Sequence, residues 1–582
     1  MNPNVLRPTS KRAVWLAIAL AVVACARDDV KQTPSWRADL KTRTAVADSG
    51  MVVTAAPLAT RVGVEVLRRG GNAADAAVAV AFALEVVYPT AGNVGGGGFI
   101  VARMHDSSAA LDFREVAPLK STRDMYLDSA GNVTDKSLVG ALAAGVPGSV
   151  AGLWEFHRKY GSKPWRELVA PAIALADTGF ITDSAFVEDL HYDSAKLARF
   201  PASVAYFIPG GHLVPIGVRW RAPELAATLT RIAEQGRDGF YTGETARLIV
   251  AEMKRSGGII SLEDLARYQA VWREPVEYAY RGHRVVAMPP VSSGGLTDAL
   301  IANIAGGFDL RAMGWHSPRA IHVIAEAERM AFYRRNKTLG DPAFTSIPFA
   351  SFLSADTAAA LRATIGTAAS PDPGDETGMN KGKHTTHFSI VDGQGNAVAM
   401  TTTLNEGHGS DLTVTGAGFL LNDEMDDFTT KPGAVNAMGL RQWEANAIAP
   451  GKRMLSSMVP TIVLDSAGAP LLVTGASGGA HIITGVFQVM SNVLDFQMPL
   501  ADAMAAPRFH AQDYPDSILV EHGGLSDETR RALEAMGHHL DILAPGEDLA
   551  MVQSILRVNG RWQGVSEPRG NGLALGYPAA VR

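Results

Sequence analysis

The sequence predicts an α+β fold in which β-hairpins form sheets that helices cover. Residues 385–403, 460–474 and 552–565 each contain two runs rich in β-branched residues, joined by turn-forming residues. This pattern is typical of β-hairpins. Between the second and third of these segments, apolar side chains recur at helical spacing from Ile482 to Val493. Hairpins with intervening helices indicate sheets with helices packed on their faces.

Composition narrows the class of protein. The chain has 582 residues, of which 47% are hydrophobic and 19% are charged, and its net charge is −6. This length and composition are typical of a globular protein with large cores and allow several domains. The negative charge gives no basic surface for nucleic acid, so we expect no nucleic-acid partner. After residue 25 no apolar run reaches the roughly 18 residues of a membrane-spanning helix.

The N-terminus has the pattern of an export signal. Basic residues precede the apolar run Ala13–Ala24, which is too short to span a membrane. Cys25 follows at once, is the single cysteine of the chain, and stands where a bacterial lipoprotein box has its lipidated residue. We therefore expect a lipoprotein-type signal peptide over residues 1–24, lipidation of Cys25 and a polar tether over residues 25–46. Ala26 resembles the sorting pattern for the outer membrane, so an exported, periplasmic protein with a lipid anchor is predicted.

Two helices are predicted near the start of the folded part. Apolar residues from Leu58 to Leu67 share one helical face, and Gly70-Gly71 ends the pattern. Asn72 and Asp75 then form a capping-box sequence before an Ala/Val-rich run that continues to Pro89. Because this second helix is apolar nearly all round, we expect it to be buried.

A glycine run at 92–98 precedes a predicted strand at 99–103. Glycine runs can bind phosphate, but no Lys-Ser/Thr pair follows this one, and it does not open a helix. Close approach of backbone to backbone, or to substrate, is the better interpretation. Further along, helical patterns occupy 225–234 and 318–333, a short strand is expected at 418–421, and residues 430–451 are loop-like.

The central hairpin follows an unusual loop. Residues 368–383 are polar, contain two prolines and show no apolar period, and they open directly onto the strand at 385–391. A long loop without structure in a dense chain is functional or disordered. Our hypothesis is that the backbone is cut before Thr385, because an N-terminal threonine carries its own base, the α-amine. The alternative is a plain hairpin with threonine on its solvent face.

Two other kinds of chemistry compete with this hypothesis. Residues 475–479 fit the Gly-x-Ser-x-Gly elbow around Ser477, lie between a predicted strand and a helix, and are followed by Asp495 and His510 in triad order. Against this interpretation, the preceding chain lacks the regular strand–helix alternation of a doubly wound sheet. A metal site could use His384, His387 and His408, but their spacing matches no zinc pattern.

Eight short motifs, in order along the chain, resemble one family, the γ-glutamyltransferases (glutathione hydrolases) of the N-terminal-nucleophile hydrolase superfamily. The resemblance covers nearly everything from about residue 50 to the end. The motifs are Pro57-Leu58-Ala59-Thr60, Gly92 to Phe99, Asp112-Phe113-Arg114-Glu115, Thr385-Thr386-His387, Thr403-Leu404-Asn405, Met425-Asp426-Asp427-Phe428, Leu455-Ser456-Ser457-Met458 and Gly478-Gly479.

The resemblance implies a four-layer αββα sandwich and a precursor that cuts itself between His384 and Thr385. The products would be a large subunit, residues 47–384, and a small catalytic subunit, residues 385–582, which remain associated in one intertwined fold. Thr385 would be the nucleophile and its α-amine the base. Thr403 would orient the Thr385 hydroxyl, and the N–H groups of Gly478 and Gly479 would form the oxyanion hole.

The resemblance also implies a substrate pocket with fixed charges of both signs. A γ-glutamyl group carries an ammonium and a carboxylate on one carbon, so both charges need partners. Arg114 with Ser456 and Ser457 would hold the carboxylate, and Asp427 with Glu424 and Asn405 the ammonium. Glu424 stands where many bacterial members have Gln. In the loop at 430–451, which would cover the substrate, Met438 replaces an aromatic residue common in bacterial members.

The implied reaction is transfer of a γ-glutamyl group through an ester on Thr385 to water or to the amine of an amino acid or peptide. Glutathione is the expected donor, and no metal or organic cofactor is expected. Two alternatives remain open. One is a glutaryl (cephalosporin-type) acylase of the same family, which would leave Asp427 and Glu424 without an ammonium partner. The other is a non-catalytic lipoprotein that binds amino acids.

Overall fold

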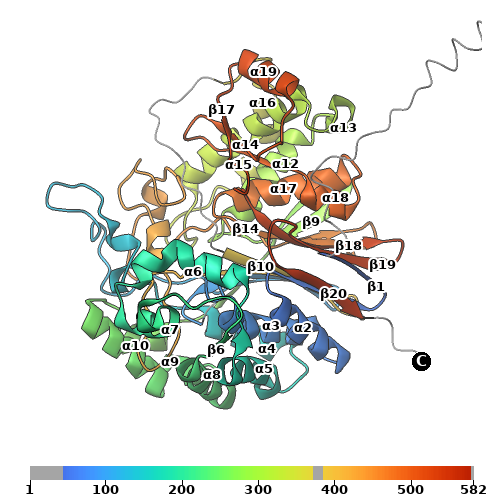
Figure 1. The fold of residues 1–582 in the computed structure, drawn as a ribbon. Helices are drawn as coiled ribbons and strands as arrows, with labels where there is room; N and C mark the ends of the chain where they lie inside the picture. The colour runs from blue at the N-terminus through green and yellow to red at the C-terminus, as the bar shows by residue number, and fades with distance from the viewer. Residues whose placement is uncertain (1–42, 93, 371–384, 578–582) are drawn as a thin grey trace, which may run out of the picture. The chain divides into compact units, whose positions relative to one another are not determined.

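Two antiparallel β-sheets lie face to face at the centre of the fold (Figure 1). The computed structural model describes residues 43–92, 94–370 and 385–577. The expected signal peptide, Cys25 and His384 lie outside these residues. Of the expected tether, residues 25–46, the part up to residue 42 also lies outside the described residues. The prediction that the tether extends to residue 46 is wrong, because Thr44 begins strand β1 (Thr44–Ala47), which pairs with β19 (Arg561–Ser566).

Within the described residues the first sheet has eight strands. Its path runs β1, β19, β18 (Met551–Val558), β13 (Pro470–Thr474), β12 (Thr461–Leu464), β9 (His283–Ala287) and β8 (Val276–Tyr280), and β14 (Ala476–Ser477) pairs with β18. The second sheet runs β20 (Leu573–Tyr577), β2 (Gly50–Thr54), β10 (Thr385–Val391), β11 (Ala397–Thr403), β3 (Gly97–Met104), β4 (Ser107–Asp112) and β7 (Val271–Arg273). All three predicted hairpins are confirmed, because β10–β11, β12–β13 and β18–β19 pair with each other.

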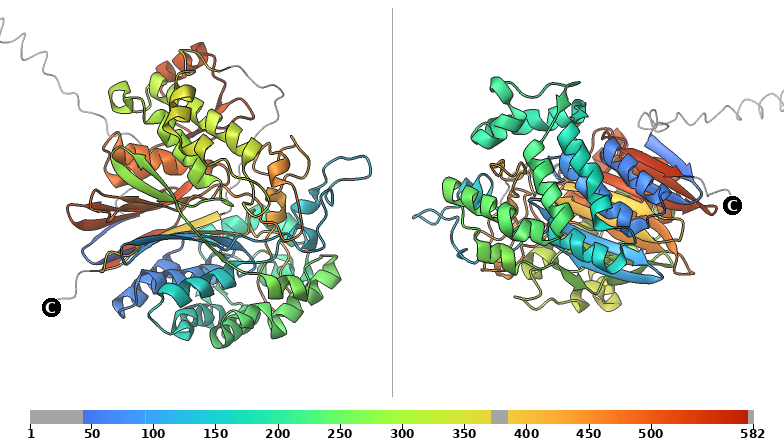
Figure 2. Two further views of the ribbon diagram at one scale, coloured as in Figure 1. Left: turned by 180° about the vertical axis from the view of Figure 1, so that it is seen from behind. Right: turned by 90° about the horizontal axis from the view of Figure 1, so that it is seen from below.

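Helices cover the outer face of each sheet (Figures 1 and 2). On the second sheet lie α2 (Pro57–Arg68), α3 (Ala73–Val87) and α4 (Ser149–Tyr160), with α5 (Trp165–Thr178) and α8 (Pro223–Gln235) beyond them. On the first sheet lie α12 (Gly294–Ala305), α17 (His481–Leu494) and α18 (Leu500–Ala505), and α14 (Pro318–Thr338) packs on α12. The order helix, sheet, sheet, helix is visible from the front and from behind.

The remaining elements are peripheral to these layers. The other α-helices of the described chain are α6 (Ser184–Leu197), α7 (Pro201–Phe207), α9 (Asp238–Tyr241), α10 (Gly243–Ser256), α11 (Leu262–Arg267), α13 (Leu310–Met313), α15 (Ala350–Leu353), α16 (Ala355–Arg362) and α19 (Asp527–Ala535). Two small sheets complete the fold: β15 (Phe509–Ala511), β16 (Ile518–Val520) and β17 (Leu540–Ile542), and β5 (Phe180–Ile181) with β6 (Arg219–Trp220). No helix of the described chain is both long enough and apolar enough to cross a membrane.

Strand alternation assigns each side chain of the second sheet to one of two cores. In β10, Phe388 and Ile390 face the helices α2 to α5, whereas Val391 lies between the sheets. Neighbouring residues of a strand point to opposite faces. Thr385, His387 and Ser389 therefore point to the same face of the sheet as Val391. The hydroxyl of Ser389 donates to the Gln553 carbonyl of the first sheet, 2.9 Å away. Thr385 therefore begins a central strand on the face that looks toward the first sheet.

The buried helix and the glycine run behave as the sequence predicts. Helix α3 begins with a complete capping box between Asn72 and Asp75, and every one of its residues is buried. A side chain at Gly95 would overlap the Leu420 carbonyl, and one at Gly96 would overlap the Thr403 carbonyl. The glycines thus let one backbone lie against another.

One predicted strand is wrong. Residues 418–421 contribute only an isolated bridge between Thr413 and Leu420. Gly416 and Gly418 both have positive φ, so the backbone turns sharply there and Leu420 pairs within its own loop.

Candidate active site

Thr385 and Thr403 are the centre of the candidate site. They lie opposite each other in the β10–β11 register. The hydroxyl of Thr385 donates to that of Thr403 at an oxygen–oxygen distance of 3.3 Å. The Asn405 N–H, 2.8 Å away, also donates to the Thr403 hydroxyl. Thr403 is held in place by the backbone, so its hydroxyl is a fixed partner for Thr385.

A small cavity joins Thr385 to residues from distant parts of the chain. Its volume is about 20 Å³, enough for little more than one water molecule. The lining residues are Arg114, Thr385, Thr403, Asn405, Glu424, Asp427, Met438, Leu440, Ser456, Ser457, Met458, Gly479 and Ile482. Of the site residues that the family resemblance implies, all but Gly478 and His384 are in this set.

Arg114 lies between two carboxylates from the 3₁₀ helix Glu424–Asp427. One of its terminal nitrogens is 2.5 Å from the Glu424 carboxylate, and the other forms a short ion pair with Asp427. Its Nε donates to the Met454 carbonyl at 3.3 Å. A planar guanidinium can contact both acids at once. The residues expected to hold the two ends of a γ-glutamyl group therefore contact each other here.

Burial controls the protonation of these groups. It disfavours the charge of Arg114, but Glu424, Asp427 and Glu115 more than compensate, so the pKa of Arg114 is raised. Burial raises the pKa of Glu115 to about 8, and raises the pKa of Glu424 and of Asp427, although Arg114 opposes the shift in all three. A second cation in the site would favour the ionised carboxylates.

Arg335 is a further site residue that the sequence did not reveal. It is fully buried on α14, and its guanidinium donates to the Ser457 hydroxyl at 3.0 Å and to the Ser293 hydroxyl at 2.8 Å. Burial lowers its pKa to about 10, while Asp427 and Asp513 act in the opposite direction. Arg329 and Arg334 lie in the same helix, and no local signal distinguishes Arg335 from them.

Asn436 anchors the covering loop to the site. Its side-chain N–H donates to Asp427 at 3.2 Å, and its side-chain oxygen accepts the N–H groups of Met438 and Leu440 at 3.0 Å each. Met438 is buried, and its sulfur occupies the space that a side chain at Gly479 would need. The loop therefore closes the cavity through Met438.

The two glycines expected to form an oxyanion hole precede helix α17. Both have positive φ, 130° at Gly478 and 58° at Gly479, which other residues rarely adopt. A helix N-terminus presents N–H groups outward. Gly479 lines the cavity, whereas Gly478 lies against the Leu549 carbonyl.

The comparisons with known proteins identify the family. The family model for gamma-glutamyltranspeptidase matches residues 59–577. The glutathione hydrolase proenzyme of Pseudomonas sp. (strain A14) is 46% identical over 547 residues, which cover 91% of this chain and 95% of that protein. The chain belongs to the γ-glutamyltranspeptidase family.

Other relatives agree with this assignment. The glutathione hydrolase proenzyme of Escherichia coli (strain K12) is 44% identical over 540 residues, 91% of this chain and 92% of that protein. The crystal structure of a cephalosporin acylase from Bacillus halodurans superposes with a TM-score of 0.82 at 28% identity, covering 93% of this chain and 97% of that one. This γ-glutamyltranspeptidase is therefore an enzyme, and the acylase shares its fold at lower sequence identity.

The serine triad suggested by the sequence is not assembled in this γ-glutamyltranspeptidase. Asp495 accepts hydrogen bonds from Tyr280 at 2.6 Å and Ser491 at 2.8 Å, and pairs with Arg281. Both ring nitrogens of His510 are occupied, one by the Thr484 hydroxyl at 2.9 Å and one by Gln512 at 3.1 Å. The Gly-x-Ser-x-Gly pattern arises here because glycines precede a helix.

Of the histidine metal site considered from the sequence, the two residues that the structure describes are engaged in other contacts. His384 lies outside the described residues. His387 bonds Thr401 at 2.8 Å and Ser389 at 3.2 Å, and burial lowers its pKa to about 3. His408 bonds Asp193 at 2.9 Å instead. The two rings therefore serve separate polar contacts.

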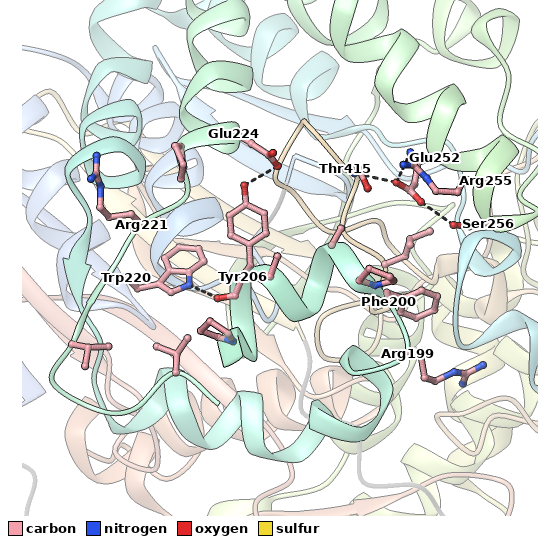
Figure 3. Close-up of a pocket in the computed structure, with 18 of the residues that line it drawn as sticks. Arg199, Phe200, Tyr206, Trp220, Arg221, Glu224, Glu252, Arg255, Ser256 and Thr415 are labelled. Atoms are coloured by element: carbon pink, nitrogen blue, oxygen red, sulfur yellow. Dashed lines mark hydrogen bonds and ion pairs between the residues drawn. The ribbon is translucent and has the colours of Figure 1, made fainter. Parts of the chain in front are cut away.

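A larger cavity of about 1010 Å³ lies away from Thr385 (Figure 3). Its polar groups already bind one another. Glu252 accepts from Ser256 at 2.8 Å and from the Thr415 N–H at 3.1 Å, and Tyr206 donates to Glu224 at 2.9 Å. Size alone does not make this cavity a catalytic site, because no convergent set of reactive groups lines it.

Proposed function

We propose that this γ-glutamyltranspeptidase is a self-processing glutathione hydrolase with the αββα fold of N-terminal-nucleophile hydrolases, and that Thr385 is its nucleophile. One observation carries the proposal. Thr385 shares a cavity with a buried guanidinium, Arg114, and two buried carboxylates, Glu424 and Asp427. This combination suits a substrate that carries both a carboxylate and an ammonium.

Self-processing makes the nucleophile. The Thr385 oxygen attacks the carbonyl carbon of His384, the peptide C–N bond breaks, and the Thr385 nitrogen takes up the hydroxyl proton. Water then hydrolyses the resulting ester and leaves a free α-amine on Thr385. The large subunit, which ends at residue 384, and the small subunit, residues 385–582, stay together because β10 and β11 lie between β2 and β3 in one sheet.

Catalysis then uses the free N-terminus. The α-amine of Thr385 accepts the hydroxyl proton while the oxygen attacks the γ-carbonyl of the donor. The N–H groups of Gly478 and Gly479 stabilise the tetrahedral oxyanion. The amine proton passes to the leaving group, and a γ-glutamyl ester remains on Thr385. Water, or the amine of an amino acid or peptide, resolves the ester. Thr403 holds the attacking oxygen in position.

The substrate's charges replace contacts within the site. The α-carboxylate of a γ-glutamyl group takes the position opposite Arg114, with Ser456 and Ser457 as further donors. Its ammonium is held by Asp427, Glu424 and the Asn405 side chain. A glutaryl group lacks the ammonium and would leave two buried carboxylates facing an uncharged carbon, which is costly. Glutathione is thus preferred over cephalosporin-type glutaryl amides, and no metal or organic cofactor takes part in the reaction.

The N-terminal pattern supports export. We infer that residues 1–24 are removed, that Cys25 carries the lipid and that Ala26 directs the protein to the periplasmic face of the outer membrane, with the lipid as its one membrane contact. Labelling cells with a radioactive fatty acid tests this. Label on the wild-type protein and none on Cys25→Ser supports the lipid anchor. Equal labelling of the two proteins contradicts lipidation of Cys25.

Intact mass of the purified protein, expressed without residues 1–24, tests the main proposal. Wild type should give two fragments divided at Thr385, and Thr385→Ala one chain without turnover of glutathione or γ-glutamyl anilide. Ser477→Ala is the control for serine chemistry and should be processed and active. Turnover of glutaryl anilide in place of γ-glutamyl anilide would favour the acylase. An uncut wild-type chain would favour the non-catalytic binder.

A further inference from the structure

His322, Glu326 and His538 form a compact group of potential metal ligands away from the Thr385 cavity. Each offers one ligand atom, and these atoms lie within 4.8 Å of one another. Among the residues that the structure describes, this is the one group of three or more such side chains. All three are buried. His322 and Glu326 are four residues apart on α14, so they share one face of that helix.

Hydrogen bonds fix the tautomers of the two rings. His322 Nε2 lies 3.2 Å from the Gly366 carbonyl, which can only accept, so Nε2 carries the proton and Nδ1 a lone pair. His538 Nε2, 2.7 Å from that Nδ1, therefore donates to it. A ring that donates its other N–H to a backbone carbonyl is the usual arrangement of a metal-ligating histidine.

The Glu326 carboxylate has capacity for a further partner. One oxygen accepts from Arg329 at 3.2 Å and from the Ser370 N–H at 3.2 Å, and the other accepts a short bond from the Ser370 hydroxyl. A carboxylate offers about four lone-pair positions. Arg329 also pairs with Asp516 at 2.9 Å, so it keeps a partner if Glu326 turns toward a metal.

We propose that His322 Nδ1, His538 Nε2 and a Glu326 oxygen bind a structural Zn²⁺ ion, with a water molecule or the Ser370 hydroxyl as fourth ligand. Zinc takes nitrogen and carboxylate ligands in tetrahedral geometry. Bonds of about 2.0–2.1 Å at tetrahedral angles separate two nitrogens by about 3.3 Å. The two nitrogens must therefore move apart by about 0.6 Å from their present separation of 2.7 Å. The Nε2 proton of His538 transfers through solvent to its Nδ1, and the ring stays neutral.

The site joins segments that are far apart in sequence. Helix α14 supplies His322 and Glu326, the residues after α19 supply His538, and the segment 366–370 supplies the Gly366 and Ser370 contacts. The Ala369 N–H also donates to the Met536 carbonyl at 2.7 Å. None of the three ligands lines the Thr385 cavity, so the metal stabilises the fold independently of the proposed reaction.

Metal titration of the purified full chain tests the site. The protein is dialysed against a chelator, then titrated with Zn²⁺ by calorimetry and with Co²⁺ by visible absorption. We expect one equivalent of Zn²⁺, the visible bands of tetrahedral Co²⁺, and a melting temperature that rises with Zn²⁺. His538→Gln should weaken Zn²⁺ binding roughly 100-fold or more, since losing even an outer-shell partner costs about 10- to 100-fold.

His539→Gln is the matched control, because His539 is the exposed neighbour of His538, and it should bind Zn²⁺ as wild type does. Glu326→Gln is a second variant in case His538→Gln does not fold, which circular dichroism of the metal-free proteins reveals. Absence of stoichiometric Zn²⁺ binding to wild type overturns the site. So does binding that neither His538→Gln nor Glu326→Gln weakens.

Discussion

The hydroxyl oxygens of Thr385 and Thr403 lie 3.3 Å apart because the two residues are directly opposed in the β10–β11 pair. The register places one residue of each strand on the same face at each position. The close approach of Gly96 to the Thr403 carbonyl fixes the end of β11 as well. The position of the proposed nucleophile is thus set by the sheet and not by a loop.

Thr403→Val should slow turnover of γ-glutamyl anilide about 100-fold, because a small misplacement of a reacting group costs about this much. Thr403→Ser, which keeps the hydroxyl, should recover most of the rate. Thr402→Val is the control: Thr402 points to the other face of the strand and bonds the Gly97 carbonyl at 2.8 Å. Intact mass shows whether each variant is processed. Equal kcat for Thr403→Val and wild type would exclude an orienting role.

Arg114→Lys should raise KM for glutathione about 100-fold. Lysine carries a point charge and cannot bind the substrate carboxylate through two parallel hydrogen bonds, as a planar guanidinium can. The matched control is Arg123→Lys, since Arg123 is partly exposed and pairs with the exposed Glu444 at 3.1 Å, a contact of small value. Steady-state kinetics of the processed enzymes decide the matter, and an unchanged KM in Arg114→Lys contradicts the carboxylate role.

Substrate binding should weaken as the pH falls. Burial raises the pKa of Glu424, and only the ionised carboxylate attracts the substrate's ammonium. Lowering the pH through this raised pKa protonates Glu424, so KM should rise toward acid. In Glu424→Gln the amide oxygen accepts from the ammonium at any pH, so its acid-side rise in KM should be shallower. Profiles of KM from pH 5 to 9 test this, and parallel profiles would exclude Glu424.

Asn436→Ala should open the covering loop. The change removes three hydrogen bonds that tie Met438, Leu440 and Asp427 together, each worth about 1 kcal/mol. A looser loop admits water, so the rate of hydrolysis should rise relative to the rate of transfer. Met438→Ala should change this ratio in the same direction. Lys431→Ala, an exposed change in the same loop, is the control. Product ratios with and without a dipeptide acceptor give the answer. An unchanged ratio in both variants would show that the loop does not control the ratio of hydrolysis to transfer.

Local chemistry let the sequence predict the three hairpins and several of the helices. The turn at 392–396 gives the central hairpin its bounds, and the Asn72–Asp75 capping box starts α3, because turns and caps depend on neighbouring residues. The motifs that resemble one family supplied the candidate site residues. They did not reveal that Arg114 pairs with Asp427, which is 313 positions away.

The tertiary structure decided which side chains meet. Arg335 and Asn436 bind residues that line the cavity. Asp495 and His510 have partners other than Ser477, and His538 contacts His322 across 216 positions. Sheet register and helix packing bring these residues together, and both depend on contacts between segments distant in sequence. The sequence by itself therefore determined the three hairpins, the capped and buried helix α3 and the reaction that the site suits. Only the packing of the two sheets and their helices decided which charges are paired and buried.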